Sequence, residues 1–262
     1  MVEVGTGLAR VERDGRRADV VLNRPEKRNA IDEAMIDDLT EAFRRVADDD
    51  DVWAATLLGE GPVFSAGMDL EMMRDATREE HAVIGKRLHE LLDAVEALPQ
   101  PVVVGVKRAA VAGAFELTLP ADLRVLGREA AYGVVEVELG VFPHGGTTQR
   151  LPRLVGLAKA KELVLTAEYV DPEEALRLGL VSEVCPDEAV DDRARALADD
   201  LTRKAPLGLR RAKRALNRAL DVPLDAGLEY ERTLALDLYG TRDRIEGFDA
   251  RIEGREPTFE GR

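Results

Sequence analysis

The sequence is poor in the features that mark several large classes of protein. Its 262 residues include one cysteine, Cys185, so no disulfide can form within the chain and no zinc cage of several cysteines is possible. No apolar run approaches the roughly 20 residues that a transmembrane helix needs. The N-terminus lacks the basic-then-apolar pattern of a secretory signal, and the last residues are not a peroxisomal signal. We therefore expect a cytoplasmic protein, in a reducing compartment and with no membrane partner.

Well-known catalytic motifs are absent too. The two serines, Ser65 and Ser182, do not lie in a G-x-S-x-G elbow. No G-x-x-x-x-G-K-[ST] phosphate loop occurs, and no G-x-G-x-x-G follows a strand. No two of the three histidines are four residues apart, which is the spacing of a helical zinc site. These absences argue against serine-triad hydrolases, kinases, dinucleotide-binding enzymes and typical metal enzymes, and we expect no bound metal.

What is present fits a globular protein with an acidic surface. The chain has 37 Lys and Arg against 51 Asp and Glu, a net charge of −14, which argues against a general nucleic-acid binder. Hydrophobic residues make up 45% and charged residues 34%, ordinary proportions for a soluble domain. The length suits one large domain, or one domain with an appendage.

Strands and helices alternate along the first two thirds of the chain. Asp14-Gly15, between two β-rich runs, predicts a hairpin. Apolar residues spaced by three or four predict helices, and short continuous apolar runs predict buried strands. Such alternation is typical of an α/β fold with partly parallel strands, and the pattern beyond about Asp187 is helical. The expected helices and strands cover residues 32–47, 53–58, 84–95, 102–106 and 122–127.

Two glycine-bearing loops each follow a predicted strand and precede helix-compatible sequence. They are GPVFSAGMDL, residues 61–70, and AAVAGAFEL, residues 109–117. Helix N-termini carry unpaired N–H groups, and two of them brought together can bind an oxygen that gains negative charge. One such loop alone is most simply a strand-to-helix turn. A pair of them, with Glu116 three residues after Gly113, favours a catalytic site.

Six stretches share their order along the chain with one known family. They are LNRPEKRNAI (22–31), GPVFSAGMDL (61–70), AAVAGAFELTLPADLRV (109–125), YGVVEVELGVFPHGGTTQRLPRLVG (132–156), DPEEALRLGLVSEV (171–184) and APLGLRRAKRALN (205–217). Together they resemble the enoyl-CoA hydratase/isomerase, or crotonase, superfamily. The resemblance implies an α/β spiral of stacked β-β-α units with a C-terminal helical region. It also implies an acyl-CoA thioester substrate, no cofactor beyond the coenzyme A of that substrate, and a homotrimer or a dimer of trimers.

The resemblance gives catalytic roles to residues of both loops. The backbone N–H groups of Met68 and Gly113 match the oxyanion-hole positions that bind the thioester carbonyl. Glu116 and Glu136 match the two catalytic carboxylates of hydratases, with Glu136 as the main acid/base and Glu116 positioning and activating a water. Partial burial would raise their pKa values toward a useful range. Glu138 is a rival of Glu136, because the two would share one face of a strand.

A further set of residues is expected to contact the substrate. His144 stands where relatives often have glycine, so its N–H can help to hold the water and its ring can line the pocket, although a lone histidine is more often structural. Lys27 and Arg28 match the region that meets the CoA phosphates. We interpret the carboxylates of Asp69 and Asp122 as helix caps or acceptors for loop amides. The expected substrate-binding residues are Lys27, Arg28, Ala66, Gly67, Asp69, Leu70 and His144.

The second loop departs from the family pattern. Lys107-Arg108 replaces Asn-Gly, and Ala112-Gly113-Ala114 replaces a run of glycines, so we expect a slightly reshaped loop because alanine tolerates positive φ poorly. Two carboxylates favour a hydratase over an isomerase. An isomerase, another enolate reaction such as C–C cleavage, and an acyl-CoA-binding protein without catalysis remain alternatives.

We also expect a division of the chain into two parts. Residues 1–195 form the spiral core, and residues 196–262 form a helical trimerisation region. The pocket walls are expected from the helix after Met68, from residues 84–95 and from the C-terminal helices. The basic residues of the helix that begins near Ala205 are explained equally well by contact with CoA and by a solvated helix face.

Overall fold

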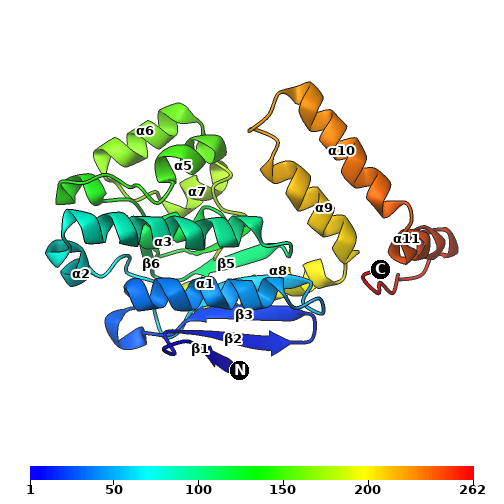
Figure 1. Cartoon of the computed structure of the whole chain (residues 1–262), viewed down its shortest axis with the longest axis horizontal. Helices are drawn as coiled ribbons and strands as arrows, with labels where there is room; N and C mark the ends of the chain where they lie inside the picture. The colour runs from blue at the N-terminus through cyan, green and yellow to red at the C-terminus, as the bar shows by residue number, and fades with distance from the viewer.

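The computed structural model describes residues 1–262, and its main sheet begins with the hairpin predicted at Asp14-Gly15 (Figure 1). Strand β2 (Ala9–Asp14) pairs antiparallel with β3 (Arg17–Leu22), and Gly15 in the turn has φ +57°. The short strand β1 (Val2–Val4) extends the sheet beside β2. The predicted turn is therefore confirmed.

Four more strands join this sheet in parallel, in the order β1-β2-β3-β4-β5-β7-β9. Parallel neighbours need crossover connections, which explains the alternation of strands with helices in the sequence. All three strands predicted from apolar runs are present. The parallel additions are β4 (Ala54–Gly59), β5 (Val102–Val106), β7 (Leu123–Gly127) and β9 (Glu183–Cys185).

Helices cover both faces of the main sheet. Helix α1 (Glu33–Ala47) and helix α3 (Arg78–Ala97) lie on one face, and α8 (Val190–Thr202) lies on the other (Figure 1). Asp32 begins α1 by accepting a hydrogen bond from Met35 N at 2.9 Å. These positions agree with the helices predicted over 32–47 and 84–95.

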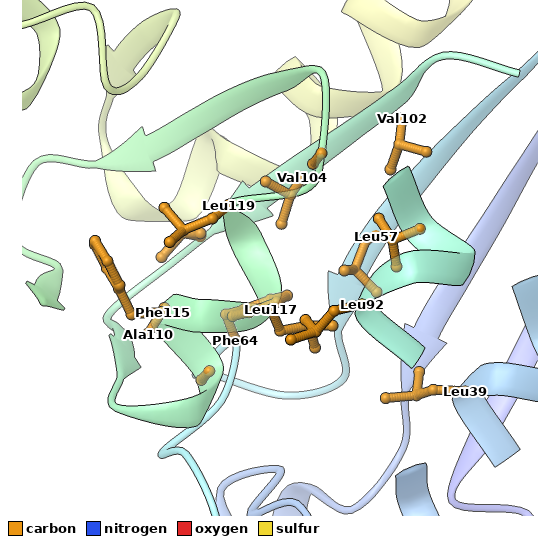
Figure 2. Close-up of a cluster of buried hydrophobic side chains, with 14 of the residues drawn as sticks. Leu39, Leu57, Phe64, Leu92, Val102, Val104, Ala110, Phe115, Leu117 and Leu119 are labelled. Atoms are coloured by element: carbon orange, nitrogen blue, oxygen red, sulfur yellow. The ribbon is translucent and has the colours of Figure 1, made fainter. Parts of the chain in front are cut away.

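Alternate residues along a strand pack into two different cores, one on each face of the sheet. In β4, Leu57 belongs to the larger core with Leu39 of α1 and Leu92 of α3, and Figure 2 shows these three side chains. The next residue, Leu58, packs instead in the smaller core with Ala194 of α8. Successive side chains of a strand point to opposite faces, so an unbroken apolar run is required where both faces are buried.

A second, two-stranded sheet lies beside the two glycine-bearing loops. Strand β6 (Ala109–Val111) pairs in parallel with β8 (Ala131–Gly133). The second loop therefore begins with the short strand β6 and does not follow β5 as an irregular turn, which the sequence did not predict. Two short helices, α2 (Leu70–Asp75) and α4 (Gly113–Thr118), begin where the loops end.

The rest of the chain is mainly helical, as predicted. None of its helices is both long and apolar enough to cross a membrane. The predicted boundary between residues 195 and 196 falls inside α8, and the division into two parts stays a prediction. The remaining helices are α5 (Thr147–Val155), α6 (Leu157–Thr166), α7 (Pro172–Arg177), α9 (Pro206–Asn217), α10 (Leu224–Leu238) and α11 (Arg242–Glu253), with 3-10 turns η1 (Pro25–Lys27), η2 (Glu136–Leu139) and η3 (Asp187–Ala189).

Helices α9 and α10 form a hairpin that projects from the body of the molecule (Figure 1). Its apolar side chains are largely uncovered: Leu216 is 71% exposed and Leu220 is 67% exposed. The exposed leucines of this hairpin therefore do not pack on either core of their own chain.

The last residues leave the helical pattern and fold back onto the core. The buried carboxylate of Asp243 accepts hydrogen bonds from Glu260 N at 2.7 Å and from Gly261 N at 2.9 Å. Gly261 lies against Pro206 and Trp53, where an added Cβ would be in van der Waals contact with both. A helix prediction that runs to the C-terminus is therefore wrong for residues 254–262.

Candidate active site

Backbone hydrogen bonds fix the first loop on both sides of Met68. Ile31 N donates to Gly67 O at 2.8 Å, and Asp69 N donates to Ile31 O at 2.8 Å. Gly67 has φ +97°, and a Cβ on it would lie 2.5 Å from Val111 O, so only glycine fits here. The N–H of Met68, between these bonded neighbours, has no acceptor in the protein.

The second loop brings another unpaired N–H to the same place. Ala112 N donates to Gly133 O at 3.0 Å, and Gly113 is the first residue of α4, so its N–H has no acceptor within the helix. A Cβ on Gly113 would lie 3.6 Å from Met68 N and 2.8 Å from Met68 Cγ. The N–H groups of Met68 and Gly113 thus lie side by side. Ala112 has φ 54° and ψ −124°, a conformation that favours glycine, so the alanine adopts the strained backbone of this position and the expected reshaping of the loop stays a prediction.

Glu116 lies on α4, one turn after Gly113, and is only 3% exposed. Thr147 N donates to its Oε1 at 3.3 Å. Gly145 passes so close that a Cβ there would lie 2.6 Å from its Oε2. Burial, and then the negative charge of Glu136, raise the pKa of Glu116 to about 7. Near neutral pH this carboxyl group can therefore both accept and donate a proton.

Glu136 is the first residue of the 3-10 turn η2 and is partly buried. Val135 N donates to its Oε2 at 2.9 Å, and burial raises the pKa of Glu136. Glu136 and Glu116 line one cavity, whereas Glu138 is exposed and lies outside it. Because the segment is a 3-10 turn and not a strand, Glu136 and Glu138 do not share a face, and only Glu136 meets Glu116.

The two carboxylates and the two N–H groups face one cavity of about 570 Å³. Its walls come from the two loops, α2, α3 and the segment around η2, and they are mostly apolar. An apolar cavity with a few convergent polar groups is the usual form of a small-molecule site. The lining residues are Ala66, Met68, Leu70, Met73, Arg74, Ile84, Gly85, Leu88, Val111, Ala112, Gly113, Glu116, Val135, Glu136, Leu139, Val141, Phe142 and His144.

The structure separates the expected substrate-binding residues into two groups. Ala66, Leu70 and His144 line the cavity, and the side chains of the others do not. Asp69 caps α2 by accepting from Glu71 N and Met72 N, and it pairs with Arg24 at 3.1 Å, which agrees with its interpretation as a structural carboxylate. Gly67 shapes the loop backbone and contributes no side chain.

Lys27 and Arg28 lie outside the cavity but next to its first loop. Both are exposed and neither has a carboxylate partner, while Arg28 O accepts a hydrogen bond from Ala66 N at 2.9 Å. Their contact with the phosphates of CoA stays a prediction.

Two basic residues of α9, Lys213 and Arg210, bind other parts of the fold and do not line the cavity. Lys213 is buried and binds Asp122 at 2.7 Å, and Asp122 also accepts from Val102 N at 2.7 Å. Arg210 donates to Val52 O at 3.3 Å. No residue of the C-terminal helices lines the cavity, so the prediction that they supply a wall is wrong within one chain.

The role of the segment after His144 was missing from the sequence prediction. The carboxylate of Glu116 accepts a hydrogen bond from Thr147 N, 31 residues later in the chain, and Gly145 packs closely against it. The only sequence signal was the Gly145-Gly146 pair. The unusual pair in the second loop is also explained: Lys107 binds Asp191 at 2.6 Å, and Arg108 N donates to Asp187 at 2.6 Å, both away from the cavity.

Known proteins are similar to this chain over nearly its whole length. The family model for enoyl-CoA hydratase/isomerase matches residues 14–262. A probable enoyl-CoA hydratase of Mycobacterium tuberculosis is 36% identical over 255 residues, which cover 95% of this chain and 96% of the relative. The 2,3-dehydroadipyl-CoA hydratase of Escherichia coli is 36% identical over 252 residues, which cover 96% of this chain and 98% of the relative.

Solved structures show the same fold. The crystal structure of an enoyl-CoA hydratase from Bacillus anthracis superimposes with a TM-score of 0.94 at 30% identity, covering 97% of this chain and 100% of that one. The predicted spiral architecture is therefore confirmed. The chain belongs to the enoyl-CoA hydratase/isomerase family, as an enzyme of the enoyl-CoA hydratase type within the crotonase superfamily.

Proposed function

We propose that the enzyme adds water across the 2,3 double bond of an enoyl-CoA thioester. The observation that carries this proposal is the convergence of the free N–H groups of Met68 and Gly113 on a cavity that also holds Glu116 and Glu136. The two N–H groups bind the thioester oxygen and stabilise the enolate that forms on it. Removal of one such donor typically costs ~2.7–4 kcal/mol of transition-state stabilisation.

The carboxylates move the protons of the reaction. Glu116 and Glu136 hold a water between them, and its oxygen adds to C3 as one carboxylate takes up its proton. The pair then delivers one proton to C2 of the enolate, so water is added with no net change in the protonation of the two carboxyl groups. We assign the main acid/base role to Glu136 and the positioning and activation of water to Glu116. The raised pKa of each carboxyl group supports these roles, since proton transfer is most efficient near the working pH.

The test is the loss of enoyl-thioester absorbance when the protein is mixed with crotonyl-CoA. We expect turnover by the wild type, and Glu136→Gln is expected to lower kcat by about 100-fold or more while acyl-CoA binding persists. Glu138→Gln is the matched control and should keep the wild-type rate. Bound acyl-CoA without turnover of any enoyl-CoA would identify a non-catalytic binding protein, and turnover of only 3-enoyl-CoA would identify an isomerase.

We further propose that the active form is a cytoplasmic homotrimer or a dimer of trimers. The exposed leucines of α9 and α10 support self-association, since such apolar surface is rarely left in water. Light scattering of the purified protein measures the mass directly, and a monomer at micromolar concentration would contradict this assembly.

A further inference from the structure

All three histidines of the chain lie close together at one side of the cavity. The rings of His81 and His144 meet edge to face with centroids 4.9 Å apart, and the ring of Phe142 lies 6.1 Å from that of His144. His81 and His89 are one turn before and one turn after Gly85 on α3. A Cβ on Gly85 would lie 4.0 Å from His144 Cε1, so the bare backbone at Gly85 accommodates the imidazole against the helix.

The imidazole of His144 is an unpaired polar group in an apolar wall. It is partly buried, it lines the cavity, and its ring nitrogens bind no other residue of the chain. Burial, and then the nearby His81 and His89, lower the pKa of His144, so the ring is neutral at pH 7 and offers one N–H donor. The neighbouring rings hold it in place, so little rotamer freedom is lost when a ligand binds to it.

Arg74 is the other polar side chain of the lining without a role in the hydration reaction, and it is 70% exposed. It comes from α2 and, with His144, is the only charged or polar side chain of the lining besides the two carboxylates already described. Asp75 binds its Nε and Nη2 at 2.7 Å each, which leaves Nη1 without a partner in the chain. The lining therefore carries two hydrogen-bond donors that the hydration reaction does not use.

We propose that His144 and Arg74 recognise a carboxylate at the far end of the acyl group, so that the preferred substrates are 2-enoyl-CoA thioesters of dicarboxylic acids. This inference rests on the proposed function for the place of the reacting carbons, beside Glu116 and Glu136. The chain beyond C3 then runs along the apolar side chains of α2 and α3. A methyl terminus leaves the His144 donor unpaired and Arg74 in contact with water, whereas a carboxylate accepts from both through charge-assisted hydrogen bonds.

The test compares saturated ligands that cannot be hydrated. Isothermal titration at pH 7 measures the Kd of adipyl-CoA and hexanoyl-CoA, which have six carbons and differ only in the terminal carboxylate. Suberyl-CoA and octanoyl-CoA repeat the comparison at eight carbons. We expect the wild type to bind the dicarboxylic member of at least one pair about tenfold more tightly, the usual effect of a hydrogen bond to a charged group.

Two variants test whether His144 and Arg74 cause the preference for the dicarboxylic ligand. His144→Phe keeps an aromatic ring in the wall but removes its nitrogens, and Arg74→Met removes the guanidinium from α2. Each is expected to reduce the preference severalfold and to leave hexanoyl-CoA binding unchanged or stronger. His89→Gln is the control, since His89 is exposed and outside the lining, and should keep the wild-type preference.

Three outcomes would overturn the inference. They are equal affinity for both members of both pairs, a preference that survives both His144→Phe and Arg74→Met, and an equal gain from 6-hydroxyhexanoyl-CoA, which would indicate recognition of any polar terminus. None of these measurements needs turnover. If the protein hydrates no enoyl-CoA, the proposed reaction is disproved. The binding data still decide whether it recognises the carboxylate.

Discussion

The two loops that present the free N–H groups differ in how well their residues suit the backbone. In the first loop, Gly67 occupies φ +97° at a position where no side chain fits. In the second, Ala112 occupies φ 54° and Arg108 occupies φ 59°, although both carry a Cβ. Such conformations cost a non-glycine residue about 1–3 kcal/mol and persist only where the surroundings enforce them. The position of each N–H is therefore fixed by the hydrogen bonds around the loop, even where the local residue disfavours it.

Gly67→Ala should break the first loop and have the largest effect. The new Cβ would lie 2.5 Å from Val111 O, a backbone atom that cannot rotate away, so Met68 N–H must move. We expect kcat with crotonyl-CoA to fall by about 100-fold or more, together with a lower Tm. Gly15→Ala is the matched control, since Gly15 also has positive φ but nothing within 4 Å. It should lower Tm and leave kcat unchanged, and an unchanged rate in Gly67→Ala would contradict our account.

Glu116→Gln tests the buried carboxyl group of the second loop. The pKa of Glu116 rises from 4.5 to about 7 on folding, so the folded state binds more protons between these values. The contribution of Glu116 to the free energy of unfolding should therefore fall as pH rises from 4.5 to 7 and then level off. We expect the variant to be more stable than the wild type at pH 8 by up to ~3 kcal/mol, with no difference near pH 4. Urea unfolding at several pH values measures this, and a pH-independent difference would rule out the titration of Glu116 as the cause.

Ala112→Gly should relax the second loop. Glycine adopts φ 54°, ψ −124° without a Cβ clash but loses more entropy on folding, so we expect a net gain of about 1 kcal/mol in the free energy of unfolding. The rate with crotonyl-CoA should stay within a few-fold of the wild type, because Ala112 N still donates to Gly133 O. A loss of stability would show that the alanine methyl group contributes packing that outweighs the backbone cost.

Arg108→Gly should also raise the free energy of unfolding, by the smallest amount of the four changes. Its backbone N–H keeps the bond to Asp187, and the lost ion pair with Glu129 is exposed, so it contributes little. We expect a gain of about 0.5 kcal/mol in the free energy of unfolding. The rate with crotonyl-CoA should not change, since Arg108 does not line the cavity. Arg108→Ala is the control that loses the ion pair but keeps the Cβ, and it should show no gain.

The sequence predicted the elements whose pattern is local. The hairpin at Asp14-Gly15, the apolar periodicity of α1 and α3, and the buried strands β4, β5 and β7 are all present where expected. In each of them, spacing within a few residues determines which side chains can be buried together. The resemblance to a family then placed the four central residues of the site, which the structure brings to one cavity.

Contacts between distant segments could not be predicted in this way. The hydrogen bond from Thr147 N to Glu116, the pairing of Lys213 with Asp122 and the return of the C-terminal tail to Asp243 each join segments with no pattern in common. The 3-10 turn at Glu136 was missed for a related reason: alternating apolar and acidic residues favour a strand locally, and the tertiary fold overrides that preference.

The docking of the C-terminal tail has a practical consequence. Trp53 is the only tryptophan of the chain, and it is held between the guanidinium of Arg16, 4.2 Å from its ring centroid, and the backbone near Gly261. Detachment of the tail exposes part of this indole to water, so its fluorescence emission should change when the far end of the chain detaches. The enzyme thus contains its own optical probe for the order of its last residues, with no label attached.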